Sequence, residues 1–272
     1  LNRGYGASLT DEEIANFGPG YDWKDFFYRD GKTQNHNITI TSGGSKSSQL
    51  TSLGYYEQEG VTITTKLQRF NLRNNFNSRS DDGKFNLASS LSLNFAKTNI
   101  RGSEGSSSIN RNIQFGPLYA APYVLPSDYI DDVSAFGADK GFNVFQITPL
   151  ILMDLAEKTV NKDEDIKAIY NLDVSYDLLD NLTFRSVTGV DYSSINGLYA
   201  EPSNGWSAVY FEDANNAGLG GSQQYQQTNI FSINQTTSAT YNTTFADDHS
   251  LTVAGYLESV SYTHLRAHET SN

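Results

Sequence analysis

The residues with the most reactive side chains in this sequence are carboxylates and histidines, and their spacing suits catalysis poorly. Asp131 with Asp132, and the acidic run 163–165, could pair for acid–base work or hold calcium, but solvated loop carboxylates are the commoner case. His264 and His268 have the i, i+4 spacing of helical metal ligands without a third ligand. Cysteine, the Gly-x-Ser-x-Gly elbow and the His-Glu-x-x-His motif are all absent. We therefore expect no enzymatic activity, no catalytic residue, no cofactor and no metal site.

Aromatic residues in two long segments form a second group of candidates. The segments 99–164 and 195–225 lack strand patterning, and a connection as long as the first is usually functional or disordered. Prolines stiffen the aromatic stretch 115–126. This stiffness is typical of an ordered loop that folds across the opening of a pore. Tyrosine and tryptophan rings suit sugar rings or peptide side chains. The candidate ligand contacts are Tyr119, Tyr123, Tyr129, Tyr199, Trp206 and Tyr210, and the alternative for each is packing of the loop.

Composition and charge narrow the class of protein. The net charge is −12, from 19 basic and 31 acidic residues without a basic cluster, so nucleic acid is not an expected partner. No run of about 18 apolar residues could cross a bilayer as a helix. The chain has 17 Tyr, 15 Phe and 22 Gly but only 2 Trp and 1 Met, a composition of strand and turn formers. A β-rich protein is expected.

The elements that position these residues are predicted to be strands. Apolar and polar residues alternate most clearly over 84–95. The same pattern predicts eight strands: Thr33–Ser42, Ser48–Glu57, Leu67–Asn77, Lys84–Thr98, Asp165–Leu178, Leu182–Ser194, Gln226–Asn242 and Ser250–Ser259. One short helix is predicted over Asp11 to Phe17, because Thr10 and Glu13 form a capping box.

Strand length and the connections favour a membrane barrel. Several strands are about twice the usual length and match the roughly 9–11 residues of a tilted membrane strand. Short connections at 43–47, 78–83, 179–181 and 243–249 alternate with longer ones at 58–66, 99–164 and 195–225. Outer-membrane barrels have this layout, with short periplasmic turns and long extracellular loops. The predicted fold is all-β, a partial antiparallel transmembrane β-barrel.

The predicted organisation has three parts. Residues 1–32 are a lead-in segment with the short helix, residues 33–259 are the partial barrel with extracellular loops 99–164 and 195–225, and residues 260–272 are a tail. Polar positions of each strand should face a hydrated lumen and apolar positions should face lipid. The alternative is a secreted or surface β-sandwich adhesin that binds glycan, in which the apolar face fills a core.

Motifs distributed over about Asp11 to Glu258 resemble the SusC/RagA-like TonB-dependent transporters of Bacteroidetes outer membranes. They include Asp22-Trp23-Lys24-Asp25, Gln34-Asn35-His36-Asn37, Leu53-Gly54-Tyr55, Arg69-Phe70-Asn71-Leu72-Arg73, Leu182-Thr183-Phe184-Arg185 and Gly189-Val190-Asp191-Tyr192. The resemblance implies a multi-pass barrel of about 22 strands, of which this chain supplies early ones. It also implies a plug and a Ton box outside this stretch, so we treat the chain as a fragment.

The resemblance further implies partners and a location. These are the cell outer membrane and its lipid, a SusD-like surface lipoprotein, the TonB complex acting through the missing N-terminal part, and an oligosaccharide (glycan) or peptide substrate. Residues 260–270 resemble a translated adaptor sequence, so the tail is expected to be non-native and to break the strand pattern.

Overall fold

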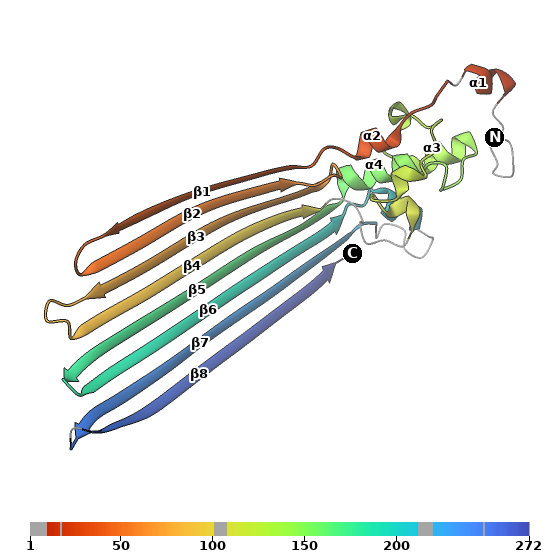
Figure 1. The fold of residues 1–272 in the computed structure, drawn as a ribbon. Coiled ribbons are helices and arrows are strands. Elements are labelled where there is room, and N and C mark those ends of the chain that lie inside the picture. The colour runs from red at the N-terminus through yellow and green to blue at the C-terminus, as the bar shows by residue number, and fades with distance from the viewer. Residues whose placement is uncertain (1–9, 17, 101–107, 212–219, 247, 272) are drawn as a thin grey trace.

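The computed structural model describes residues 10–16, 18–100, 108–211, 220–246 and 248–271. Its main element is one antiparallel sheet with the strand order β1 to β8. The strands lie side by side in a single bent layer (Figure 1). They are β1 (Lys32–Gly43), β2 (Ser47–Glu59), β3 (Thr65–Arg79), β4 (Phe85–Ile100), β5 (Val160–Leu179), β6 (Leu182–Glu201), β7 (Ser222–Phe245) and β8 (His249–Ser271).

All eight predicted strands are confirmed, and the sheet is open. Within the described residues each strand pairs with its sequence neighbours, and β1 and β8 are the free edges. The architecture is that of a section of a barrel. Two packed sheets, which the adhesin alternative requires, are not formed by the described strands.

Each strand is longer than predicted, because pairing continues through polar stretches that lack alternation. β5 begins at Val160 rather than Asp165, and its residues 162–164 pair with the end of β4. β6 continues to Glu201, so Tyr199 lies in a strand and not in a loop. The prediction that the strand pattern ends at Ser259 was also wrong, because β8 pairs with β7 as far as Ser271. The non-native origin of the tail stays a prediction.

The connections follow the predicted alternation with one exception. Short turns join β1 to β2, β3 to β4, β5 to β6 and β7 to β8 at one end of the sheet (Figure 1). At the other end, residues 101–159 and 202–221 form the two long connections. The link from β2 to β3, residues 60–64, is as short as the turn at 80–84, so the expected longer loop there is wrong.

The structure contains more helices than the one that the sequence predicts. The helix α1 (Asp11–Asn16) is confirmed, with residue 17 outside the described residues. The connection expected to be a loop instead contains α3 (Val133–Lys140), α4 (Thr148–Lys158) and three short 3-10 turns. The structure also has α2 (Trp23–Phe27) and α5 (Trp206–Phe211). No helix in the described parts of the chain combines the length and apolarity needed to cross a membrane.

Local sequence explains where α3 and α4 begin and end. The Asp132 carboxylate accepts a hydrogen bond from the Ala135 amide at 2.8 Å and caps α3. Gly141 ends α3 in the left-handed conformation, with φ of 67°. Pro149 lies in the first turn of α4, where its missing N–H costs no helical hydrogen bond.

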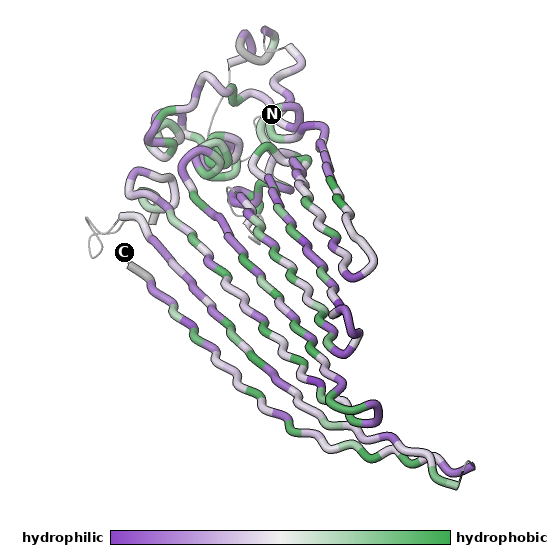
Figure 2. Tube along the Cα trace, turned by 90° about the vertical axis from the view of Figure 1, so that its left-hand side faces the viewer, coloured by the Kyte–Doolittle hydropathy of each residue, from purple (hydrophilic) through white to green (hydrophobic). Residues whose placement is uncertain are grey.

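The cross-strand register separates two faces. One row across the sheet joins Ile38, Leu53, Leu72, Leu93, Ala168, Tyr192 and Phe231, and the neighbouring row on the other face joins Asn37, Gly54, Asn71 and Asn94. Hydropathy alternates accordingly along each strand (Figure 2). We call these the apolar face and the polar face of the sheet. The alternation predicted from the sequence is therefore confirmed.

Candidate functional site

A helical cap lies at the end of the sheet that carries the long connections (Figure 1). We use this name for residues 18–31, 108–159 and 202–211. Its buried core draws side chains from all three segments, which shows that they form one body. The core residues are Trp23, Phe27, Ile113, Val124, Val133, Ile147, Leu150, Ile151, Leu152, Leu155 and Trp206.

Hydrogen bonds fasten the lead-in segment to the long connection. The Trp23 indole N–H donates to the carbonyl oxygens of Val124 at 3.0 Å and Ala121 at 3.2 Å. The Tyr21 amide donates to Pro122 O at 2.8 Å. The Trp23 ring also packs against Phe27, with ring centroids 5.8 Å apart. These contacts explain the position of the Asp-Trp-Lys-Asp motif, which anchors the cap just before the chain enters β1 at Lys32.

A buried carboxylate, Asp154 on α4, is the polar centre of the cap. Its Oδ1 accepts from the Tyr129 hydroxyl at 2.9 Å and from Lys158 Nζ at 2.7 Å. Its Oδ2 accepts from the Trp206 backbone amide at 2.6 Å. The Asp154 side chain is only 1% exposed, so every partner is needed to offset its burial. The sequence analysis did not single out Asp154.

The ammonium group of Lys158 extends this network. It donates to the Asn204 carbonyl at 2.9 Å and lies 3.5 Å from the Asp131 carboxylate. Burial is the largest single influence on Lys158 and lowers its pKa, but the hydrogen bond and charge attraction to Asp154, together with the interactions with Tyr129, outweigh burial and raise the Lys158 pKa. Burial and the hydrogen bond to Asp154 raise the pKa of Tyr129 to about 12. The network ties α4 to both long connections.

The predicted ligand contacts of the first connection occupy different settings. Tyr119 is 67% exposed and follows the 3-10 turn Gly116–Leu118. Tyr123 packs against Phe142 at 5.7 Å between ring centroids, and its hydroxyl accepts from Gln146 at 3.0 Å. Tyr129 bonds to Asp154, as described above. Two of these three tyrosines thus support the cap framework.

The predicted ligand contacts of the second connection also include both bonded or buried side chains and an exposed ring. The Tyr199 hydroxyl donates to Glu201 Oε1 at 2.8 Å, and the same carboxylate oxygen lies 3.2 Å from Arg111 Nη2. Trp206 is buried and stacks on Tyr210, with ring centroids 4.8 Å apart. Tyr210 is 49% exposed. The structure therefore brings Tyr129 and Trp206 together at Asp154 and leaves Tyr119 and Tyr210 with the most open ring surface of the six.

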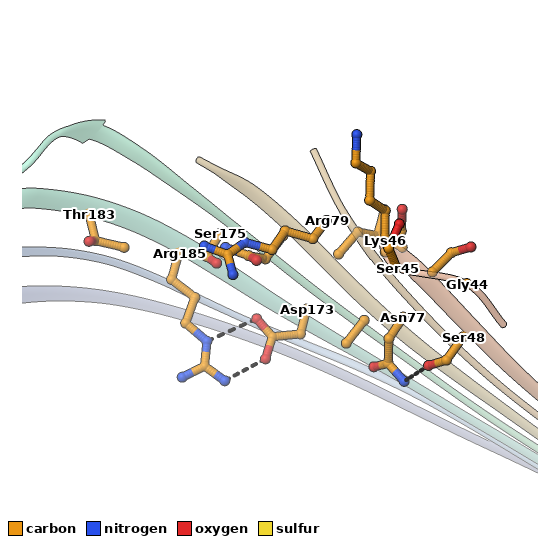
Figure 3. A pocket seen from close by; sticks show the side chains of 15 residues that line it. Gly44, Ser45, Lys46, Ser48, Asn77, Arg79, Asp173, Ser175, Thr183 and Arg185 are labelled. Carbon is orange, nitrogen blue, oxygen red and sulfur yellow. Dashed lines mark hydrogen bonds and ion pairs between the residues drawn. The ribbon is translucent and has the colours of Figure 1, made fainter. Parts of the chain in front are cut away.

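Two recesses are of interest, one between the cap and the sheet and one on the sheet alone. A cavity of about 410 Å³ lies between them, lined by residues that include Phe26, Arg29, Glu59, Met153 and Glu157. A larger one, of about 600 Å³, lies on the polar face near the short turns. There Arg185 forms a two-pronged ion pair with Asp173, and Asn77 donates to Ser48 at 3.5 Å (Figure 3). No group of three metal-binding side chains occurs among the described residues.

The apolar face of the sheet is open. Ile38, Leu53 and Phe70 are 65%, 52% and 53% exposed, although each lies in the middle of its strand. A soluble protein rarely leaves a continuous apolar surface of this extent uncovered. An open antiparallel sheet with one polar face, one uncovered apolar face and a helical cap at one end corresponds to a section of an outer-membrane barrel.

Comparisons with known proteins agree with this description. No protein-family model matches the chain. Among curated proteins, two from Formosa agariphila align along most of it. TonB-dependent receptor P3 is 23% identical over 239 residues, covering 86% of this chain and 22% of the receptor. TonB-dependent receptor P26 is 21% identical over 250 residues, covering 92% of this chain and 23% of the receptor.

Solved structures share the fold. The RagAB peptide transporter superposes with a TM-score of 0.63 at 20% identity, covering 94% of this chain and 27% of that one. The RagAB peptide importer in its open-open state gives 0.65 at 19% identity, covering 96% and 28%. The predicted resemblance to SusC/RagA-like TonB-dependent transporters is thereby confirmed. The chain spans about a quarter of the length of the relatives it matches.

Proposed function

We propose that this chain forms part of the barrel wall of a TonB-dependent transporter in the outer membrane. The observation that carries the proposal is the uncovered apolar face, which matches lipid as its surroundings. Water in the lumen would then solvate the polar face. The matches to TonB-dependent receptors and to the RagAB transporter support the same assignment. Transport, and no catalytic reaction, is the activity that we assign.

The proposed orientation places the helical cap outside the cell. Short turns are periplasmic and long connections extracellular in barrels of this kind. In that position the cap would meet a SusD-like lipoprotein, and substrate would pass it on entry. The RagAB transporter carries peptides, which supports a peptide substrate; an oligosaccharide suits exposed aromatic rings equally. Energy would come from the TonB complex through parts of the transporter beyond this chain.

Of the six aromatic candidates, Tyr119 and Tyr210 are best placed to contact substrate. Both expose a large part of the ring, whereas Tyr129 and Trp206 are committed to Asp154. The roles proposed for Tyr123, Tyr129, Tyr199 and Trp206 are therefore to hold the connections that present the exposed rings.

The test is an arginine placed on either face of β4 in the complete transporter. Leu91→Arg puts a charge at the middle of the apolar face, and should cost about 2–4 kcal/mol and lower the amount of protein in the outer membrane. Ser90→Arg is the matched control on the polar face, next to the amides of Asn75 and Asn171, and should cost under about 1 kcal/mol. Equal tolerance of both changes, measured by unfolding and by outer-membrane abundance, would contradict a lipid-facing surface.

A further inference from the structure

Lysine and arginine side chains occupy opposite faces of strands β1 to β7. All four arginines in these strands stand on the polar face, whereas four of the five lysines stand on the apolar face. The arginines are Arg69, Arg73, Arg79 and Arg185, and the four lysines are Lys32, Lys66, Lys97 and Lys162. Such a division needs a reason, because both side chains are cationic and both suit water.

The four lysines of the apolar face lie in two adjoining rows at the capped end of the sheet, where Lys66 also lines the cavity between the cap and the sheet. Successive register pairs form one row that contains Lys32, Glu59, Lys66, Asn99 and Lys162. The adjoining row on the same face contains Gln34, Glu57, Gln68, Lys97 and Glu164. Rows on one face are two residues apart, or about 7 Å. We call these four lysines the lysine belt.

The lysine belt lies directly beyond the apolar part of the face. The next row toward the short turns contains His36, Tyr55, Phe70, Phe95 and Ile166, and the row after it contains Ile38, Leu53, Leu72 and Leu93. A lysine here can rest its methylene stem on apolar surface and extend its ammonium group to the membrane surface. In a barrel wall with lipid against the apolar face, the belt would mark the level at which lipid tails give way to headgroups.

The acidic residues between these lysines are already engaged. Glu57 accepts hydrogen bonds from Tyr55 at 2.5 Å and Gln68 at 2.7 Å, and lies 3.1 Å from Lys66 Nζ. Glu164 lies 3.3 Å from Lys97, and Glu59 lies 3.8 Å from both Lys66 and Arg29. Lys32 and Lys162, in contrast, make no ion pair within the described part of the chain. Two cations therefore remain available to an external anion.

We propose that the lysine belt binds the phosphate groups of lipids in the outer leaflet. The inference rests on the proposed function, because it requires the apolar face to lie in the bilayer. Lys32 and Lys162 supply the uncompensated charge, since an ammonium close to anionic headgroups strengthens binding about fivefold. Lys66, Lys97 and Arg29 balance the three intervening carboxylates, so that these do not repel the same phosphates.

The test uses the complete transporter, purified in an uncharged detergent and titrated with dioleoyl phosphatidic acid or dioleoyl phosphatidylcholine. Native mass spectrometry counts the bound lipid. The variant Lys32→Gln/Lys162→Gln should bind phosphatidic acid about fivefold more weakly at each of the two lysines, which stand four strands apart, and Lys32→Arg/Lys162→Arg should retain binding because the charge is kept. The control Lys84→Gln/Lys140→Gln removes the same charge from a turn and from the cap, and should bind as the wild type does.

Two outcomes would overturn the lysine belt as a lipid site. One is wild-type protein without a preference for phosphatidic acid, and the other is an equal loss of binding in the belt variant and the control. Either result, obtained with protein that still resides in the outer membrane, leaves the proposed function intact. Recovery of the wild-type transporter from the soluble fraction would instead contradict the proposed function itself.

Discussion

The helical cap and the sheet use apolar side chains in opposite ways. In the cap, Leu150, Ile151 and Leu152 are completely buried, whereas in the sheet Ile38 and Leu53 expose more than half of their surface. The cap therefore carries its own core, and the sheet has none. This difference indicates that packing inside the chain stabilises the cap, while the medium against the apolar face stabilises the sheet.

Removing the Asp154 carboxylate should produce the largest effect, and it should be confined to the cap. Asp154→Ala leaves the partly buried Lys158 with only the exposed Asp131 as a charge partner, and it removes the acceptor of the Tyr129 hydroxyl and the Trp206 amide. A loss of about 3–5 kcal/mol in local stability is expected. Hydrogen exchange of residues 148–158 in the complete protein measures it. Asp131→Ala, at a highly exposed carboxylate, should cost under about 1 kcal/mol.

Matched leucine truncations compare the two regions directly. Leu152→Ala in the cap should cost about 2–5 kcal/mol, because a cavity adds to the lost transfer free energy. Leu53→Ala on the apolar face should cost about 1–2 kcal/mol, since lipid fills the space and only the transfer free energy is lost. Denaturant unfolding of the transporter in lipid gives both values. A larger loss for Leu53 would place a packed core, and not lipid, against that face.

Loss of the Trp23 indole donor should have a smaller effect on the cap. Trp23→Phe leaves the carbonyl oxygens of Val124 and Ala121 without this donor, at a cost of about 1–3 kcal/mol. Faster exchange of the Tyr21 amide, which bonds to Pro122, reports the loosened anchor. Tyr119→Phe, on an exposed ring, should leave that exchange rate unchanged.

Alkaline pH should loosen the cap before it affects the sheet. The folded pKa of Tyr129 is raised from 10.0 to about 12, so the stability it contributes is complete below pH 10 and is lost as the pH rises toward 12. Tyr129→Phe should remove this part of the pH dependence. The measurement is proteolysis of residues 108–159 as a function of pH; an unchanged profile in Tyr129→Phe would exclude Tyr129 as its source.

Sequence patterning was sufficient for the sheet because each strand has one apolar face. Phe85, Leu87 and Leu91 reveal that face without any knowledge of their neighbours. Strand ends were missed where polar residues such as Lys162 and Asp163 pair with β4, since cross-strand pairing leaves no local signal. The run 150–155 is apolar except for Asp154, and because an apolar run suits a buried helix or a strand equally, its pattern does not predict α4.

The candidate site was only partly predictable, for a related reason. Tyr129 and Trp206 were recognised as notable aromatic residues, but their partner Asp154 lies 25 and 52 residues away in sequence. Two signals in the sequence point to Asp154. It stands four residues before Lys158, the spacing of an ion pair on a helix, and an acidic residue inside an apolar run indicates a buried carboxylate with a charged partner. Contacts between the two long connections depend on how both connections fold. The alternation of apolar and polar residues in the strands carries no information about that fold.

The most direct test of the central claim measures what surrounds β4. The chain has no cysteine, so single cysteines can be introduced and spin-labelled in the complete transporter, provided that the remainder is also cysteine-free. Labels at Leu91, Leu93 and Phe95 should collide with lipid-soluble oxygen, and labels at Ser90, Ser92 and Asn94 with a water-soluble nickel chelate. A period of two in these accessibilities is the predicted result. Exposure of both sets to the nickel chelate, or protection of the first set from both reagents, would contradict a lipid-facing barrel wall.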